Sequence, residues 1–148
     1  MIYVDESIQD RLGYIVTVFV YAAEDPHLLV AQALTTAGLA PLKDEYKSGA
    51  RMTDKPHLQA LRSELCDILR ERCRIGMLLS PSADRCNLGA HIVSTAGELV
   101  RANGLATPET ILVDEGIALQ GCVAGQQGLR FVEGCDSKTA MSQNLLNG

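Results

Sequence analysis

The chain has 148 residues, enough for one compact domain, and its hydrophobic fraction of 47% is ample for a core. The formal net charge of −5 argues against a strongly basic protein that binds nucleic acid non-specifically, and the low aromatic content, without tryptophan, argues against base-stacking platforms. A nucleic-acid enzyme with a metal site stays open, because metal-binding acids themselves add negative charge.

No apolar run reaches the roughly 18 residues that a membrane-spanning helix needs. The longest run, residues 14–23, is interrupted by Thr17. The N-terminus has no basic region or cleavage site, so we expect no signal peptide, no membrane and a cytoplasmic protein. The five cysteines are odd in number and form no C-x-x-C pair, which predicts reduced thiols.

The chain opens with a predicted pair of strands. Residues 2–4 form a short apolar β-type run, residues 9–13 are polar and end in a glycine, and residues 14–22 form a long apolar β run. Because the connection is too short for a parallel crossover, we expect the second strand to return antiparallel. Its two apolar faces predict a central strand covered on both sides.

Two helices are expected next. Asp25 and Pro26 supply an N-cap and a first helical residue, and Gly38 supplies a C-cap. Residues 54–72 open with the same cap chemistry and carry leucines at helical spacing. Between the two helices, residues 45–47 predict a short edge strand.

Strands and one more helix alternate in the second half of the chain. Residues 74–80 predict a strand, 83–103 a long helix, 110–113 a buried strand and 129–132 a final short strand. The glycine-rich loop 121–128 lacks the G-x-x-x-x-G-K pattern, which excludes a phosphate-cradling loop of that class. Together the elements predict one α/β domain over residues 1–148, with a mixed sheet and helices on both faces.

Two of the apolar strands end in acids. Residues 2–4 are followed by Asp5, and residues 111–113 are followed by Asp114. If the strands lie parallel and adjacent, the two acids meet at the carboxyl edge of the sheet, where open α/β sheets place their sites. Close carboxylates repel each other unless a cation such as Mg²⁺ or Mn²⁺ lies between them. The pattern therefore predicts a metal site suited to phosphodiester hydrolysis.

The neighbouring residues are weaker candidates. Alternation along a strand turns Glu6 away from Asp5, and Glu115 is expected to be a solvated neighbour of Asp114. For each strand-end acid the alternative role is to cap a turn through backbone N–H groups. The three histidines are scattered over three predicted helices, and no Ser/His/Asp arrangement is visible.

Four segments, in this order, resemble a known family. They are Ile-Tyr-Val-Asp-Glu-Ser at residues 2–7, the long return strand, Glu-Tyr-Lys-Ser at 45–48 and Ile-Leu-Val-Asp at 111–114. Over most of the chain they resemble the "YIDES" ribonuclease H-like proteins, domain-of-unknown-function family 3800. The resemblance implies a ribonuclease H-like sheet, with three antiparallel strands followed by parallel ones.

The resemblance also implies residue roles. Asp5 would be the first metal ligand, Lys47 the family's lysine after the first helix, and Asp114 the acid that ends the later strand. The family's final helix would carry a Gln-x-x-Asp segment, which residues 142–148 lack. Either Asp136, the last acid of the sequence, serves instead, or the chain is a fragment that lacks one ligand.

From these observations we expect a metal-dependent nuclease acting on RNA or DNA. Asp5 and Asp114 would hold Mg²⁺ or Mn²⁺, Asp136 or Glu6 would complete the shell, and Lys47 would orient water or steady a phosphate. The alternative is a non-catalytic ribonuclease H-like scaffold, an interaction subunit related to mobile elements or defence, whose acidic site is incomplete. The acidic balance and the missing final acid favour this alternative, and a homo-oligomer is compatible with both.

Overall fold

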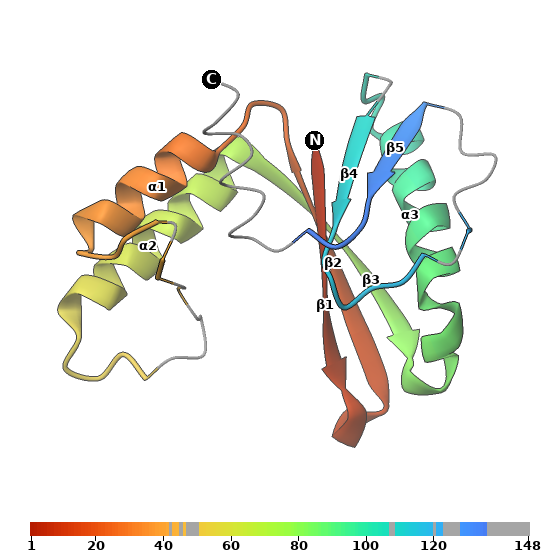
Figure 1. The fold of residues 1–148 in the computed structure, drawn as a ribbon, viewed down its shortest axis with the longest axis horizontal. Coiled ribbons are helices and arrows are strands. Elements are labelled where there is room, and N and C mark those ends of the chain that lie inside the picture. The colour runs from red at the N-terminus through yellow and green to blue at the C-terminus, as the bar shows by residue number, and fades with distance from the viewer. Residues whose placement is uncertain are drawn as a thin grey trace. The chain divides into compact units, whose positions relative to one another are not determined.

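The structure is a computed structural model that describes residues 1–41, 43–44, 46, 51–106, 109–119, 121–122 and 128–135 (Figure 1). These residues group into two compact units. The first unit comprises Met1–Tyr21 and the described part of Ile75–Asp136, and the second comprises the described part of Ala22–Arg74. The single domain over residues 1–148 stays a prediction.

One mixed sheet organises the first unit. Among the described residues five strands are hydrogen-bonded in the order β3-β2-β1-β4-β5. β1 pairs antiparallel with β2 and parallel with β4, and β4 pairs parallel with β5. This is the ribonuclease H-like arrangement of an antiparallel start followed by parallel strands, so the predicted α/β fold class is confirmed. The strands span β1 Ile2–Gln9, β2 Tyr14–Ala22, β3 Cys73–Pro81, β4 Glu109–Val113 and β5 Leu129–Val132.

The first two strands form the predicted antiparallel hairpin. A 3₁₀ turn at Asp10–Leu12 joins them, and it closes at Gly13, whose φ of 77° suits glycine. The ladder pairs β1 with β2 from Ile2 to Gln9 without a break. β1 is therefore longer than the apolar run that predicted it, and Glu6 lies within the strand rather than after it.

The core of the first unit lies between one face of the sheet and helix α3 (Leu88–Ala102), which Figure 1 shows beside the strands. α3 buries one stripe of residues at helical spacing against Ile2, Phe19 and Ile111 of the sheet. The α-helix begins later than predicted because residues 82–87 form a 3₁₀ helix in which Asp84 has non-helical φ and ψ of −93° and 15°. The stripe consists of Leu88, Ile92, Val93, Ala96 and Val100.

The second unit contains helices α1 (His27–Thr36) and α2 (Pro56–Arg72), and both were predicted. Their shared core centres on Ala33, Leu34 and Leu61. The backbone N–H of His27 donates to Asp25 Oδ1 at 3.0 Å, so the aspartate caps the first turn of α1 as its sequence position indicated. The predicted edge strand at 45–47 falls partly outside the described residues.

The structure also bears on the expectations for membrane-spanning helices and for the cysteines. No helix in the described part of the chain is both long enough and apolar enough to cross a bilayer. All five cysteines are free thiols.

Candidate metal centre

The ends of β1 and β4 lie side by side. Val4 pairs with Val113 in the parallel ladder, and the backbone N–H of Asp114 donates to the carbonyl oxygen of Val4 at 3.0 Å. Asp5 and Asp114 therefore follow paired residues on neighbouring strands that run in the same direction. The structure brings the two predicted acids to one edge of the sheet.

Three carboxylates gather at this edge. Asp5, Glu6 and Asp114 each offer one carboxylate oxygen, and these oxygens all lie within 4.8 Å of one another. The N–H of Glu6 donates to Asp5 Oδ1 at 2.8 Å, and the N–H of Gly116 donates to Asp114 Oδ2 at 3.3 Å. Asp114 thus has the turn-capping role considered as the alternative, whereas Asp5 accepts from the next N–H inside β1; each aspartate uses one oxygen for its bond.

Glu6 joins the cluster although strand alternation turns its side chain away from that of Asp5. Glu6 has the parity of the buried residues Ile2 and Val4, and Asp5 has the opposite parity. The two side chains therefore leave β1 on opposite faces, as expected. The carboxylate of Glu6 still joins the cluster, because its longer side chain reaches past the point where β4 ends at Val113.

A glycine makes room for two of the carboxylates. A Cβ atom at Gly116 would lie 2.8 Å from Glu6 Oε1 and 3.7 Å from Asp114 Oδ2. The first distance is shorter than any ordinary carbon–oxygen contact, so Glu6 could not keep its position beside a larger residue. The glycine directly after Asp114-Glu115 was a readable signal that the sequence analysis missed.

Electrostatics make this edge unfavourable for three charged acids. Burial raises the pKa of Asp5, the charge of Asp114 raises it further, and the N–H of Glu6 opposes the change. Burial also raises the pKa of Glu6, with further increases from the charges of Asp5 and Asp114 and a decrease from Arg85. Arg85, in the 3₁₀ helix before α3, is a cation near the site that the sequence did not reveal.

The donor set fits a hard divalent cation. Mg²⁺ and Mn²⁺ prefer carboxylate oxygens, and ligand oxygens around an octahedral ion with bonds of about 2.1 Å lie roughly 3–4 Å apart. The oxygens of the cluster, all within 4.8 Å of one another, lie near that spacing. Within the described chain Glu6 Oε2 is also buried without a hydrogen-bond partner, so one of the three carboxylates is incompletely satisfied by the protein.

The other two predicted site residues, Lys47 and Asp136, lie outside the described residues. Their proposed contributions to the site stay predictions. Ser7, beside the cluster in sequence, accepts a hydrogen bond from Gln9 Nε2 at 2.8 Å.

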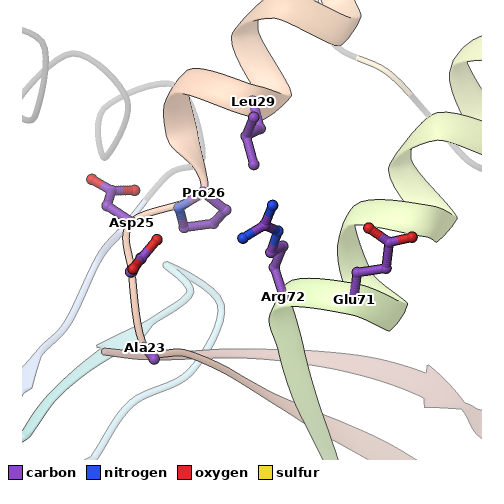
Figure 2. Close-up of a pocket in the computed structure, with 7 residues that line it drawn as sticks. Ala23, Asp25, Pro26, Leu29, Glu71 and Arg72 are labelled. Atoms are coloured by element: carbon purple, nitrogen blue, oxygen red, sulfur yellow. The ribbon is translucent and has the colours of Figure 1, made fainter.

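A separate hollow lies within the second unit. It has a volume of about 240 Å³, and Figure 2 shows Arg72 pointing between Pro26 and Leu29 while the carboxylate of Glu71 points away. The hollow shares no residue with the acidic cluster. It is lined by Ala23, Glu24, Asp25, Pro26, Leu29, Glu71 and Arg72.

The fold and the cluster together define a class: a ribonuclease H-like α/β protein with three acids at the carboxyl edge of its parallel strands. No protein-family model and no curated protein matches the chain. Among solved structures it is similar to a chain of the PCNA:RNase HII complex from Archaeoglobus fulgidus, with a TM-score of 0.48 and 17% identity over 98% of this chain and 70% of that chain. The fold assignment stands on the strand order and pairing.

Proposed function

We propose that the protein is a metal-dependent phosphodiesterase that hydrolyses RNA or DNA, with Asp5, Glu6 and Asp114 holding Mg²⁺ or Mn²⁺. The observation that carries the proposal is the meeting of three carboxylate oxygens within 4.8 Å at the carboxyl edge of the sheet. The resemblance of residues 2–7 and 111–114 to the YIDES proteins supports the same function.

Each residue has a definite part in the proposal. Backbone N–H groups orient Asp5 and Asp114, so these two carboxylates are held ready for an ion. A divalent ion bound there supplies an acidified water and positive charge opposite the phosphodiester. Glu6 is the third ligand, Lys47 steadies the phosphate, and Asp136 adds a further carboxylate.

The charge of the chain is consistent with this dependence on a cation. A protein with a net charge of −5 and three acids at one edge repels phosphate until that edge is neutralised. A cation held by these acids would reduce this repulsion. Arg85, whose positive charge lowers the pKa of Glu6, is placed to contribute to the same neutralisation.

The decisive experiment compares Asp5→Asn with Glu115→Gln. Glu115 is exposed and follows Asp114 directly, but it is not part of the cluster, so it is a matched control. Asp5→Asn should lose Mn²⁺ binding by calorimetry and Mn²⁺-stimulated cleavage of labelled RNA, DNA and RNA–DNA hybrids. The loss should exceed the roughly 10–100-fold typical of residues behind the ligands, while Glu115→Gln keeps both.

Two results would decide against the enzyme. If Asp5→Asn cleaved nucleic acid as fast as wild type, Asp5 would have no role in the reaction. Failure of the wild-type protein to bind Mn²⁺ at millimolar concentrations would favour the non-catalytic scaffold, the second function that the sequence supports.

A further inference from the structure

The outer half of β1 continues past the acidic cluster as a row of polar side chains. Asp5, Ser7 and Gln9 occupy alternate positions of the strand. The positions of opposite parity include Val4 and Ile8, which pack in the core of the first unit. Because side chains alternate across a strand, the three polar side chains lie on the face of the sheet that is turned away from α3.

One side of this row is open. β2 pairs with β1 along the whole length of the strand, whereas the parallel ladder with β4 ends at Val4. Beyond Val4, no strand other than β2 pairs with β1 in the part of the chain that the structure describes. Ser7 is exposed and Gln9 is half-buried. An extended ligand that begins at the acidic cluster can therefore lie along this side of β1.

Beyond Asp5 the row offers hydrogen-bond donors. Gln9 Nε2 donates to Ser7 Oγ at 2.8 Å, so the Ser7 hydroxyl is the acceptor in this bond. The hydroxyl keeps its own hydrogen for another acceptor, and the amide of Gln9 keeps its second hydrogen. Both side chains are neutral, so they add no charge to that of the acids. The pair therefore suits a ligand that carries acceptor oxygens.

The backbone adds a third donor. The carbonyl of Val4 accepts a hydrogen bond from the end of β4, so it points to the β4 side. In an extended strand the backbone groups of every second residue point the same way, which directs the N–H groups of Glu6 and Ile8 to that side. The N–H of Glu6 donates to Asp5 Oδ1 at 2.8 Å, so an outer side chain meets the N–H of the next residue there. The Ser7 hydroxyl and the N–H of Ile8 stand in the same relation, so one anionic oxygen can accept from both.

We propose that Ser7, Gln9 and the N–H of Ile8 bind the phosphodiester group next to the one that is cleaved, so that the nucleic acid runs along the outer half of β1. This inference rests on the proposed function, in which Asp5 holds the ion at the scissile group. Ser7 follows Asp5 by two residues, about 6.5–7 Å of strand, so it reaches a neighbouring group rather than the scissile one. Donors to phosphate oxygens position a nucleic acid without reading its bases.

The test compares substrates that differ only in length. A dinucleotide has a single phosphodiester, whereas a pentanucleotide of the same base has flanking phosphodiesters. With Mn²⁺ as the ion, Ser7→Ala should raise the KM for the pentanucleotide, relative to that for the dinucleotide, by about 10-fold, because a hydrogen bond to a charged group is lost. The effect should fall on KM rather than on kcat, because Ser7 does not touch the reacting atoms.

Three further variants sharpen the comparison. Ser63→Ala removes the same hydroxyl from an exposed position of α2, so this matched control should leave the ratio of the two KM values unchanged. Ser7→Thr retains the hydroxyl and should keep most of the wild-type ratio. Gln9→Ala should change the ratio in the same direction as Ser7→Ala. The two changes should be non-additive when combined, because Gln9 holds the Ser7 hydroxyl.

The two proposals fail separately. If wild type cleaves both substrates and Ser7→Ala has the wild-type KM ratio, the phosphate contact is overturned and the proposed function stands. If wild type cleaves neither substrate, the proposed function fails, and the contact is judged by the fluorescence anisotropy of a labelled pentanucleotide with Mn²⁺. Ser7→Ala should then bind about 10-fold more weakly than wild type. Equal binding by the two proteins, or no binding by wild type, overturns the contact as well.

Discussion

Two acids of the helical unit and the three acids of the sheet edge have different surroundings. In the helical unit Asp25 pairs with His27, and Asp67 accepts a hydrogen bond from Arg70 at 2.9 Å. Each partner lies two or three residues away in the same segment. The charge of Asp67 is therefore balanced locally by Arg70, and each pair forms within one short segment of the chain.

At the sheet edge the balance is missing. Asp5, Glu6 and Asp114 come from two strands that are distant in sequence, and across the described ranges none of them has an ion pair within 4 Å. Their nearest charges are one another, with a weaker contribution from Arg85. The pairing of β1 with β4, rather than the local sequence, therefore brings these charges together. A divalent cation is the partner that we propose for these acids.

The substitution Gly116→Ala should disturb the sheet edge most sharply. Its Cβ would lie 2.8 Å from Glu6 Oε1, so the carboxylate must move away from Asp114. The end of a flexible side chain moves at little cost to the fold. We expect Mn²⁺ affinity to fall by about 10-fold, measured by calorimetry, with a nearly unchanged melting temperature.

Gly76→Ala is the matched control for this substitution. Its Cβ would meet Leu99 Cδ1 at 3.1 Å in the core, away from the acids. It should therefore lower the melting temperature and leave Mn²⁺ affinity unchanged. Equal Mn²⁺ affinity in Gly116→Ala and wild type would contradict the placement of Glu6 in the metal site.

Most of the fold was predictable because apolar runs end where strands end. The strands at 14–22 and 129–132 have the predicted bounds. β1 was underestimated because its outer half is held by the ladder to β2 rather than by hydrophobicity. The start of α3 was misplaced because the hydrogen bond from Ser82 to Gly13 and the non-helical Asp84 depend on tertiary structure.

Only the part of the site that depends on strand direction was predictable from the sequence. Asp5 and Asp114 each follow an apolar strand, so their meeting required only a parallel pairing. The place of Glu6 depends on the reach of its side chain around a strand end, which alternation does not describe. Arg85 is near enough to lower the pKa of Glu6, and no local pattern in the sequence reports its position.

The pH dependence of the protein's stability should report on the acids at the sheet edge. The raised pKa values of Asp5 and Glu6 mean that the folded state binds these protons more tightly than the unfolded state. Their contribution therefore favours folding at low pH, and it is lost as the pH rises through the folded pKa values. This loss of stability begins above the ordinary pKa values of aspartate and glutamate carboxyls and continues to the raised values of the folded state.

Thermal melts of the metal-free protein between pH 4 and pH 7 measure this effect. Asp5→Asn should be more stable relative to wild type at pH 7 than at pH 4, because it removes the repulsion present only when the acids are charged. Mn²⁺ affinity should change in the opposite direction and fall as the pH falls, because protons compete with the ion. If the melting temperatures of wild type and Asp5→Asn changed with pH in the same way, Asp5 would not be coupled to the other two acids.

The smallest effect is expected for Asp67→Asn in the helical unit. The side chains of Arg70 and Asp67 are 75% and 53% exposed, so water screens their pair. The free energy of unfolding, measured in urea, should decrease by about 0.5 kcal/mol or less, and the difference should vanish in 1 M salt. Mn²⁺ binding should not change. If Asp67→Asn instead weakened Mn²⁺ binding as strongly as Asp5→Asn, the metal would be responding to total negative charge rather than to the arrangement of three carboxylates at the sheet edge.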